Sequence, residues 1–133
     1  MSVDSIGNFL TVIRNAVMAS KPYVLSPYSK MNAKIANILL EEGFVKGVEQ
    51  SVAVSGRKEL KIVLKYVDGE SAIHEITRVS KPSRRVYVGS QSIKPVVGGC
   101  GISILTTNRD VMTDKRAKSA NMSVGGELIC TVW

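Results

Sequence analysis

The chain has 133 residues, 44% of them hydrophobic, and carries 18 Lys and Arg against 11 Asp and Glu for a net charge of +7. This length and hydrophobic content suffice for one compact domain or two small ones, and a sequence pI of about 9.6 favours a polyanionic partner such as nucleic acid. No apolar run approaches the roughly 20 residues that cross a bilayer, and the amino-terminal residues lack an export pattern, so we expect a cytoplasmic protein with no membrane partner.

Positive charge is concentrated in the second half of the chain. Residues 1–70 hold nine basic and seven acidic side chains (9 − 7, a net of +2), whereas residues 71–133 hold nine basic and four acidic ones (9 − 4, a net of +5). The second half is therefore the predicted polyanion-binding part. Because an ordinary basic protein could have the same composition, the motifs must decide.

The residues that commonly carry catalysis or bind metals are sparse. Cys100 and Cys130 are far apart in the sequence, and His74 is the only histidine. This pattern offers neither a disulfide framework nor a zinc ligand set, and no nucleophile stands beside a matched base. We predict a protein that is not an enzyme, with no metal, cofactor or small-molecule substrate.

The first predicted element is an amphipathic helix. Asp4 or Ser5 can cap its start, Lys21-Pro22 marks its end, and apolar residues recur at helical spacing, namely Ile6, Phe9, Leu10, Ile13 and Val17. Arg14 and Asn15 fall beside this stripe. They are candidate RNA contacts at the edge of an interface, or a plain solvent-exposed pair.

A short extended segment, 23–26, is predicted to lead through Pro27 to a second helix that begins near Ser29 and ends at Gly43. Its apolar side consists of Met31, Ile35, Ile38 and Leu39. Lys30 and Lys34 stand one turn apart, either as a pair that binds phosphate or as part of the solvent-exposed face.

Two strands, 44–54 and 58–66, are predicted next and are joined by the turn Ser55-Gly56-Arg57. The polar turn Asp68-Gly69-Glu70 is the predicted boundary between an N-terminal α/β subdomain, 1–69, and a β-rich RNA-binding subdomain, 70–133. The predicted fold class is α+β: a helix-strand-helix-hairpin unit packed with a mainly antiparallel β unit that contains one short helix.

The second half reads mainly as strands, with extended runs around 73–79, 85–88, 102–107 and 127–133. A basic loop stiffened by Pro82 separates the first two runs, and Arg84 and Arg85 in it are either phosphate contacts or a solvated surface cluster with no partner. Tyr87 follows in a strand. It either stacks on an exposed base or ribose, or belongs to the core with its hydroxyl at the rim.

A polar loop forms the centre of the candidate site. It places two hydroxyls, an amide and a guanidinium on consecutive residues that can reach phosphates, riboses and base edges, namely Thr106, Thr107, Asn108 and Arg109. A short helix that begins at Thr113 is predicted to follow and to display three more cations, Lys115, Arg116 and Lys118.

The closing segment adds glycines and a carboxylate. Gly125 is a further candidate contact, and Glu127 either accepts hydrogen bonds from base amino groups or 2′-hydroxyls, or braces the loop through neighbouring backbone amides. Cys130 alternates with Leu128 and Val132, so we expect these three side chains on one face of a strand and the thiol in the core.

Several separated blocks of the sequence, in this order, resemble the bacterial form of the small-subunit ribosomal protein eight family. They are Ile13-Arg14-Asn15-Ala16, Glu41-Glu42-Gly43-Phe44, Arg78-Val79-Ser80-Lys81-Pro82, Arg85-Val86-Tyr87, Gly101 to Thr107, Val111-Met112-Thr113-Asp114 with Ala117-Lys118, and Gly125-Gly126-Glu127-Leu128. The resemblance covers essentially the whole chain. One departure is Asp110, which stands where the family pattern expects glycine.

This resemblance implies a structural constituent of the small ribosomal subunit that binds small-subunit rRNA directly and helps its assembly, in a cytoplasmic or an organellar ribosome. It also implies neighbouring ribosomal proteins as partners and, as a further RNA, the protein's own messenger. The alternatives are a free RNA- or DNA-binding regulator and an adaptor whose basic surface meets acidic proteins.

Overall fold

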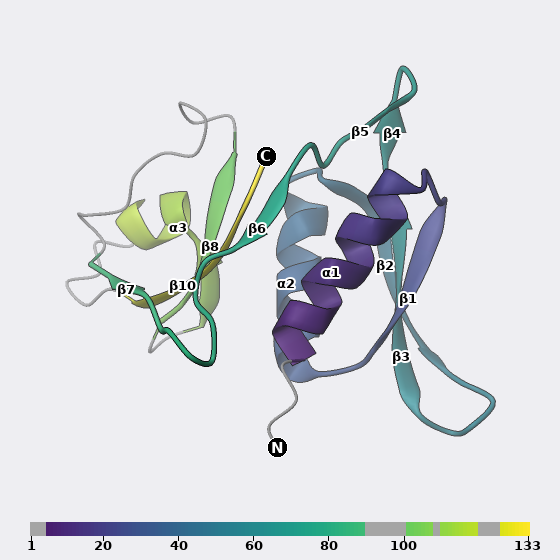
Figure 1. The fold of residues 1–133 in the computed structure, drawn as a ribbon, viewed down its shortest axis with the longest axis horizontal. Helices are drawn as coiled ribbons and strands as arrows, with labels where there is room; N and C mark the ends of the chain where they lie inside the picture. Colours follow the sequence, from purple (N-terminus) through teal and green to yellow (C-terminus); the bar gives the residue numbers. More distant parts are fainter. Residues whose placement is uncertain (1–4, 90–100, 108–109, 120–125) are drawn as a thin grey trace. The chain divides into compact units, whose positions relative to one another are not determined.

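The computed structural model describes residues 5–89, 101–107, 110–119 and 126–133, with the backbone alone for residues 118 and 119 (Figure 1). The architecture is α+β, as predicted, and the chain divides into two compact units, Met1–His74 and Glu75–Trp133. The division falls after the turn at residues 68–70 because that turn joins β4 (Tyr66–Val67) to β5 (Glu70–Ser71) in a short hairpin of the first unit. Asp68 and Gly69, with φ of 54° and 81°, supply the positive φ values that such a two-residue turn requires.

In the first unit, helices α1 (Ser5–Met18) and α2 (Lys30–Glu41) cover one face of a three-stranded antiparallel sheet (Figure 1). The helix ends follow from local chemistry: Ser29 caps α2 by accepting a hydrogen bond from the Asn32 amide at 3.0 Å, and Gly43, with φ of 81°, ends it. The helices bury their apolar stripes, which include Phe9, Leu10, Ile13, Ile35 and Leu39.

The sheet of the first unit has the order β1 (Tyr23–Pro27), β3 (Lys58–Leu64), β2 (Val45–Val52). Leu60, Ile62 and Leu64 alternate along β3 and are buried, as the period of two predicts. The predicted β2–β3 turn is confirmed, since the Ala53 amide donates to the Arg57 carbonyl at 2.8 Å.

The second unit is built around β10 (Gly126–Val132), which pairs antiparallel with three other strands. On one side it meets β6 (Ile76–Arg78) and β7 (Tyr87–Val88), and on the other it meets β8 (Ile102–Thr106). Strand β9 (Val111–Thr113) pairs with β8 and was not predicted, because three residues leave no periodic pattern to detect.

Helix α3 (Asp114–Ser119) starts one residue after the predicted Thr113, which is the last residue of β9. The Arg116 amide donates to the Thr113 hydroxyl at 3.3 Å, which is an N-cap. Asp114 is only 4% exposed and accepts a hydrogen bond from the Ser103 amide at 3.4 Å, so this carboxylate ties the helix to β8. Ala117 packs against Leu105 and Met112 on one face of the sheet.

A β-bulge interrupts β10 at Ile129. Leu128 lies opposite Leu105, yet the next pair is Cys130 with Ile104, so Ile129 is an extra residue on this strand. The bulge inverts the alternation beyond it. The prediction that Leu128 shares a face with Cys130 and Val132 is therefore wrong, whereas the predicted burial of Cys130 is confirmed.

Burial raises the pKa of the Cys130 thiol from 9.0 to about 12, with the Arg78 charge lowering it slightly. A raised thiol pKa means that the folded state holds its proton where the unfolded state releases it, so this group's stabilisation is complete below pH 9 and is lost as pH rises toward 12. In a Cys100→Ser background we expect Cys130 to resist a maleimide until denaturant unfolds the protein. Rapid labelling of the native protein at pH 8 would contradict the buried position.

None of the helices within the described ranges is both long and apolar enough to span a membrane.

Candidate nucleic-acid interface

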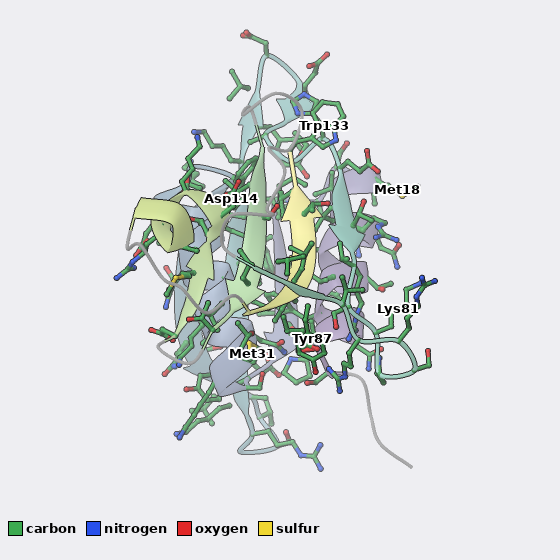
Figure 2. All side chains as sticks on the ribbon, turned by 90° about the vertical axis from the view of Figure 1, so that its left-hand side faces the viewer. Met18, Met31, Lys81, Tyr87, Asp114 and Trp133 are labelled. Atoms are coloured by element: carbon green, nitrogen blue, oxygen red, sulfur yellow. The ribbon has the colours of Figure 1, made fainter. Side chains whose placement is uncertain are left out.

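A row of three polar side chains crosses the end of the second unit's sheet. Glu127 at the start of β10 lies opposite Thr106 on β8 and opposite Tyr87 on β7. Directly opposed residues of antiparallel strands project from the same face, so hydroxyl, carboxylate and phenol stand side by side. In Figure 2, Tyr87 lies near the end at which β10 begins, whereas Trp133 marks the other end.

Tyr87 belongs to this surface and not to the core. Its exposed fraction is 71%, which makes the core alternative wrong. Thr106 and Glu127 are half-buried, whereas the Tyr87 ring beside them is exposed to solvent. Such a ring offers a face to an unstacked base or a ribose.

Strands β8 and β10 approach each other closely at Gly126, next to Glu127 in the row. A Cβ added at Gly126 would lie 2.2 Å from the Thr106 carbonyl oxygen, 2.9 Å from its carbon and 3.1 Å from the Thr107 Cγ2. Real Cβ atoms do not come that close to backbone, so only glycine allows the two strands to pair here. The closeness of the Thr106 backbone therefore explains why a glycine stands at position 126.

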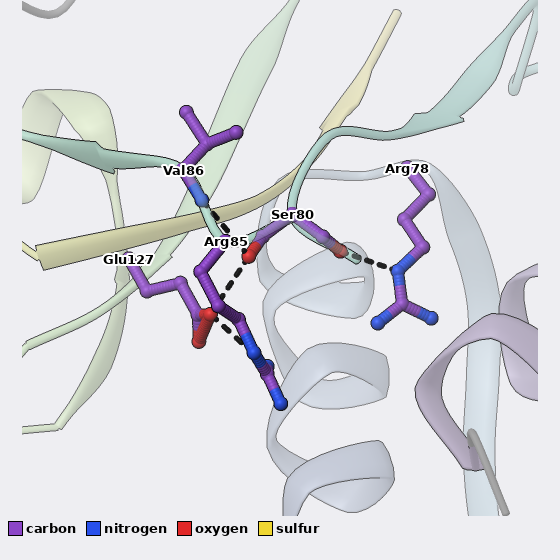
Figure 3. A network of polar contacts seen from close by, with 5 residues as sticks. All are labelled: Arg78, Ser80, Arg85, Val86 and Glu127. Atoms are coloured by element: carbon purple, nitrogen blue, oxygen red, sulfur yellow. Dashed lines mark hydrogen bonds and ion pairs between the residues drawn. The ribbon is translucent and has the colours of Figure 1, made fainter. Parts of the chain in front are cut away.

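A polar network holds Glu127 and Arg85 together (Figure 3). The Ser80 hydroxyl donates to Glu127 Oε2 at 2.7 Å, and the Arg85 guanidinium donates to the same oxygen at 3.1 Å. The Val86 amide in turn donates to Ser80 Oγ at 3.3 Å. The carboxylate thus braces the turn between β6 and β7 through the side chains of Ser80 and Arg85, whereas the sequence had suggested bracing of the loop after Thr106 through backbone amides. Arg85 offsets the carboxylate's repulsion of phosphate.

The loop between β6 and β7 is a tight turn that carries cations. The Lys81 amide donates to the Arg84 carbonyl at 2.9 Å, and the Arg84 amide donates back to the Lys81 carbonyl at 3.0 Å, with Pro82-Ser83 at the tip. Lys81, Arg84 and Arg85 are exposed. Arg78 Nε donates to the Ser80 carbonyl and secures the start of the turn. The turn therefore presents its charges from a fixed backbone.

Thr107 closes the next loop instead of simply projecting from it. Its amide and its hydroxyl donate to the Asp110 carbonyl at 3.0 and 2.8 Å, and the Asp110 amide lies 3.2 Å from the same hydroxyl. The Asp110 carboxylate accepts from the Val111 amide at 2.8 Å. Asp110 thus stabilises the loop by hydrogen bonding, through its backbone and its side chain.

Helix α3 covers the other face of the sheet from the polar row, and its described cations are Lys115 and Arg116. Ala117 forms a buried cluster with Leu105 and Met112, against which Leu128 packs. Leu105 precedes Thr106 on β8 and Leu128 follows Glu127 on β10, so both project from the face opposite the row. Lys115 and Arg116 are exposed, as predicted. The candidate residues of the second unit therefore form two groups, the row with its basic turn and the α3 cations, one on each side of the sheet.

The four candidates in the first unit are all exposed. Arg14 and Asn15 lie on α1, and Lys30 and Lys34 lie one turn apart on α2. They fit a charged binding surface of this unit, considered by itself.

Four predicted contacts fall partly or wholly outside the described residues. Asn108, Arg109 and Gly125 lie outside them entirely, and the side chain of Lys118 does as well. Two site residues were missed from sequence, Ser80 and Arg78. The role of Ser80 depends on Glu127, 47 positions away on β10, and no local pattern signals such a partner. Arg78 acts locally, on the Ser80 carbonyl two residues further on.

Within residues 5–89, 101–107, 110–119 and 126–133, no group of three or more His, Cys, Asp and Glu side chains could hold a metal ion. A sheet end with hydroxyls, an exposed ring and fixed guanidinium groups has the donors, acceptors and charges of a binding surface. These features define a binding protein.

Comparison with known proteins identifies the family. The family model described as ribosomal protein S8 matches residues 4–133. Proteins named small ribosomal subunit protein uS8 are similar over their full length: that of Brucella anthropi is 50% identical over 134 residues, covering 100% of both chains, and that of Paracoccus denitrificans is 47% identical over 130 residues, 98% of this chain and 97% of its own. The chain belongs to the ribosomal protein S8 family. Members of this family are structural ribosomal proteins and not enzymes.

Proposed function

We propose that this protein is a structural constituent of the small ribosomal subunit that binds small-subunit rRNA directly and helps its assembly, in the cytoplasm where bacterial ribosomes work. The observation that carries the proposal is the row of Thr106, Glu127 and Tyr87 beside the basic turn, in a chain matched along its length by ribosomal proteins. Neighbouring small-subunit proteins are the expected protein partners.

The surface fits RNA better than B-form DNA. A-form helices expose a wide, shallow minor groove with 2′-hydroxyls, and irregular loops expose bases. A threonine hydroxyl both donates and accepts, Tyr87 offers a ring, and Arg85 offers a charge whose position is set by Glu127. Recognition therefore combines shape and ribose contacts with a few base edges.

Thr106→Val tests this proposal at its centre. The substitution keeps the shape of the side chain and removes the hydroxyl, so we expect binding of the cognate rRNA fragment to weaken by roughly 1 to 3 kcal/mol while binding of random RNA stays the same. Filter binding to both RNAs measures the difference. Equal losses on the two RNAs would remove Thr106 from specific recognition.

Lys115→Ala and Arg116→Ala should act differently. Both side chains are exposed, and loss of one phosphate contact weakens binding of all RNAs alike and lowers the slope of log affinity against log salt by about one unit. Titrations at several salt concentrations measure the slope. An unchanged slope for both variants would place α3 outside the interface.

The protein's own messenger RNA is a further partner under this proposal, because the same surface binds any RNA with the same local fold. In competition experiments, a messenger fragment should displace the rRNA fragment from the wild-type protein, and Thr106→Val should weaken the binding of both RNAs.

Sedimentation tests the alternative of a free regulator. A native protein that fails to sediment with small subunits at moderate salt would favour that alternative.

A further inference from the structure

Strand β1 is the outer strand of the first unit's sheet, where it pairs with β3 alone among the described strands (Figure 1). The Leu64 amide donates to the Pro22 carbonyl at 3.0 Å, and the Tyr28 amide donates to the Lys58 carbonyl at 3.1 Å. Because antiparallel ladders alternate, residues 24 and 26 also direct their amides and carbonyls toward β3, while Tyr23 and Leu25 direct theirs outward. This edge can accept another strand.

Two hollows run along this edge. One, of about 530 Å³, is lined by Lys21, Pro22, Tyr23, Val24 and Leu25. The other, of about 480 Å³, is lined by Leu25, Ser26, Pro27 and Tyr28 with residues of the β2–β3 turn and β3, namely Ser55, Arg57, Lys58 and Glu59. Leu25 stands between the hollows, so together they follow the whole of β1.

Apolar side chains are exposed around these hollows. The exposed fractions are 46% for Tyr23 and 49% for Leu25, both of which line a hollow. A nucleic acid gains little from aliphatic side chains, and its phosphates only accept hydrogen bonds. An extended polypeptide instead matches the alternating donors and acceptors and places its side chains in the hollows.

Charge indicates the composition of that polypeptide. The lining carries three cations, Lys21, Arg57 and Lys58, against the single carboxylate of Glu59. A further cation, Lys61 Nζ, lies 4.7 Å from the centre of the Tyr23 ring. A segment in which acidic residues alternate with apolar ones complements this edge.

We propose that β1 binds an extended, acidic and apolar segment of a neighbouring small-subunit protein by strand addition. The proposal rests on the proposed function in one respect, since the partner is a component of the subunit. Pro27 has no amide to donate, so the added strand pairs with Tyr23 and Leu25 and ends there. Direct rRNA binding by the free protein does not use this edge.

A photo-crosslinking residue at position 25 of the full chain, assembled into small subunits, tests the proposal. We expect an adduct with one segment of one neighbouring protein, identified by mass spectrometry as rich in Asp, Glu and apolar residues. The same residue at position 37, on the exposed side of α2, is the control. An adduct with rRNA, or a yield no higher than that from position 37, would overturn the proposal.

A second pair of variants tests the backbone pairing, with the photo-crosslinking residue now at position 23. Leu25→Pro removes one outward amide without breaking the β1–β3 ladder, and Leu25→Val keeps the amide. We expect the crosslink yield to fall about tenfold for Leu25→Pro, in line with the loss of one or two hydrogen bonds, and to stay unchanged for Leu25→Val. Both variants should bind free rRNA as the wild type does. Equal yields from the two variants would reject strand addition, whereas weak rRNA binding by the wild-type protein would count against the proposed function alone.

Discussion

Gly126→Ala should destabilise the second unit by about 3 kcal/mol, the upper end of the cost of overpacking, and should abolish specific rRNA binding. The added methyl would meet the Thr106 carbonyl oxygen at 2.2 Å, which is backbone that cannot rotate away. β8 and β10 would have to separate at the point where Thr106 and Glu127 stand together. Urea unfolding and filter binding measure the two effects.

Gly47→Ala is a matched control for this substitution. Gly47 is also a strand glycine, yet a Cβ there would meet only the Val63 side chain, at 3.7 and 3.8 Å, which is ordinary contact. We expect its effect on stability to stay within about 0.5 kcal/mol. If both alanine variants were equally stable and bound rRNA normally, close approach at Gly126 would not be a requirement of the site.

The second large effect is expected from Glu127→Ala. Ser80 is only 2% exposed, so loss of Glu127 leaves the proton of a buried hydroxyl without an acceptor, at a cost of about 1 to 3 kcal/mol, although the Ser80 oxygen still accepts from the Val86 amide. Arg85 loses the partner that fixes it. We expect rRNA affinity to fall by at least about tenfold, because a mobile guanidinium must be ordered on binding. Thermal unfolding and filter binding provide the measurements.

Glu127→Gln distinguishes the hydrogen bond between Glu127 and Ser80 from the ion pair between Glu127 and Arg85. The amide oxygen still accepts from Ser80, so stability should return to within about 1 kcal/mol of the wild type. The exposed Arg85–Glu127 ion pair itself contributes only about 0 to 1 kcal/mol, since the Arg85 side chain is 49% exposed. If Glu127→Ala bound rRNA as tightly as the wild type, the network would have no part in recognition.

The helices and strands of the first unit could be predicted from the sequence because local interactions determine them. The start of α2 at Ser29, its end at Gly43 and the turn at residues 55–57 are short-range signals, and each lies where predicted. The alternation of Leu60, Ile62 and Leu64 likewise needs no knowledge of the partner strands. These elements therefore depend on interactions between near neighbours in the chain.

The structure of the second unit was harder to predict, because the interactions that determine it join residues far apart in the sequence. The bulge at Ile129 appears only when β10 is paired with β8, and it reverses the face expected for Leu128 relative to Cys130. The need for glycine at position 126 comes from Thr106, twenty positions earlier in the sequence. Neither constraint can be predicted from the periodicity of the sequence, because both depend on the partner strand.

The candidate site was predicted as a set of residue types more successfully than as a geometry. Exposed Arg84, Arg85, Lys115 and Arg116 follow from charge and turn chemistry. Their separation by the sheet was not predictable, since it depends on the face that α3 covers. The hydroxyl of Thr107 was expected to face a ligand, but it closes its own loop on Asp110.

Hydroxyl-radical footprinting of small-subunit rRNA with the purified protein tests the central claim most directly. If the row beside the basic turn reads one RNA fold, the wild-type protein protects a single structured region, and Thr106→Val weakens that protection while the protein stays folded. Protection spread along the whole rRNA, or a confined footprint unchanged by Thr106→Val and Glu127→Ala together, would contradict it.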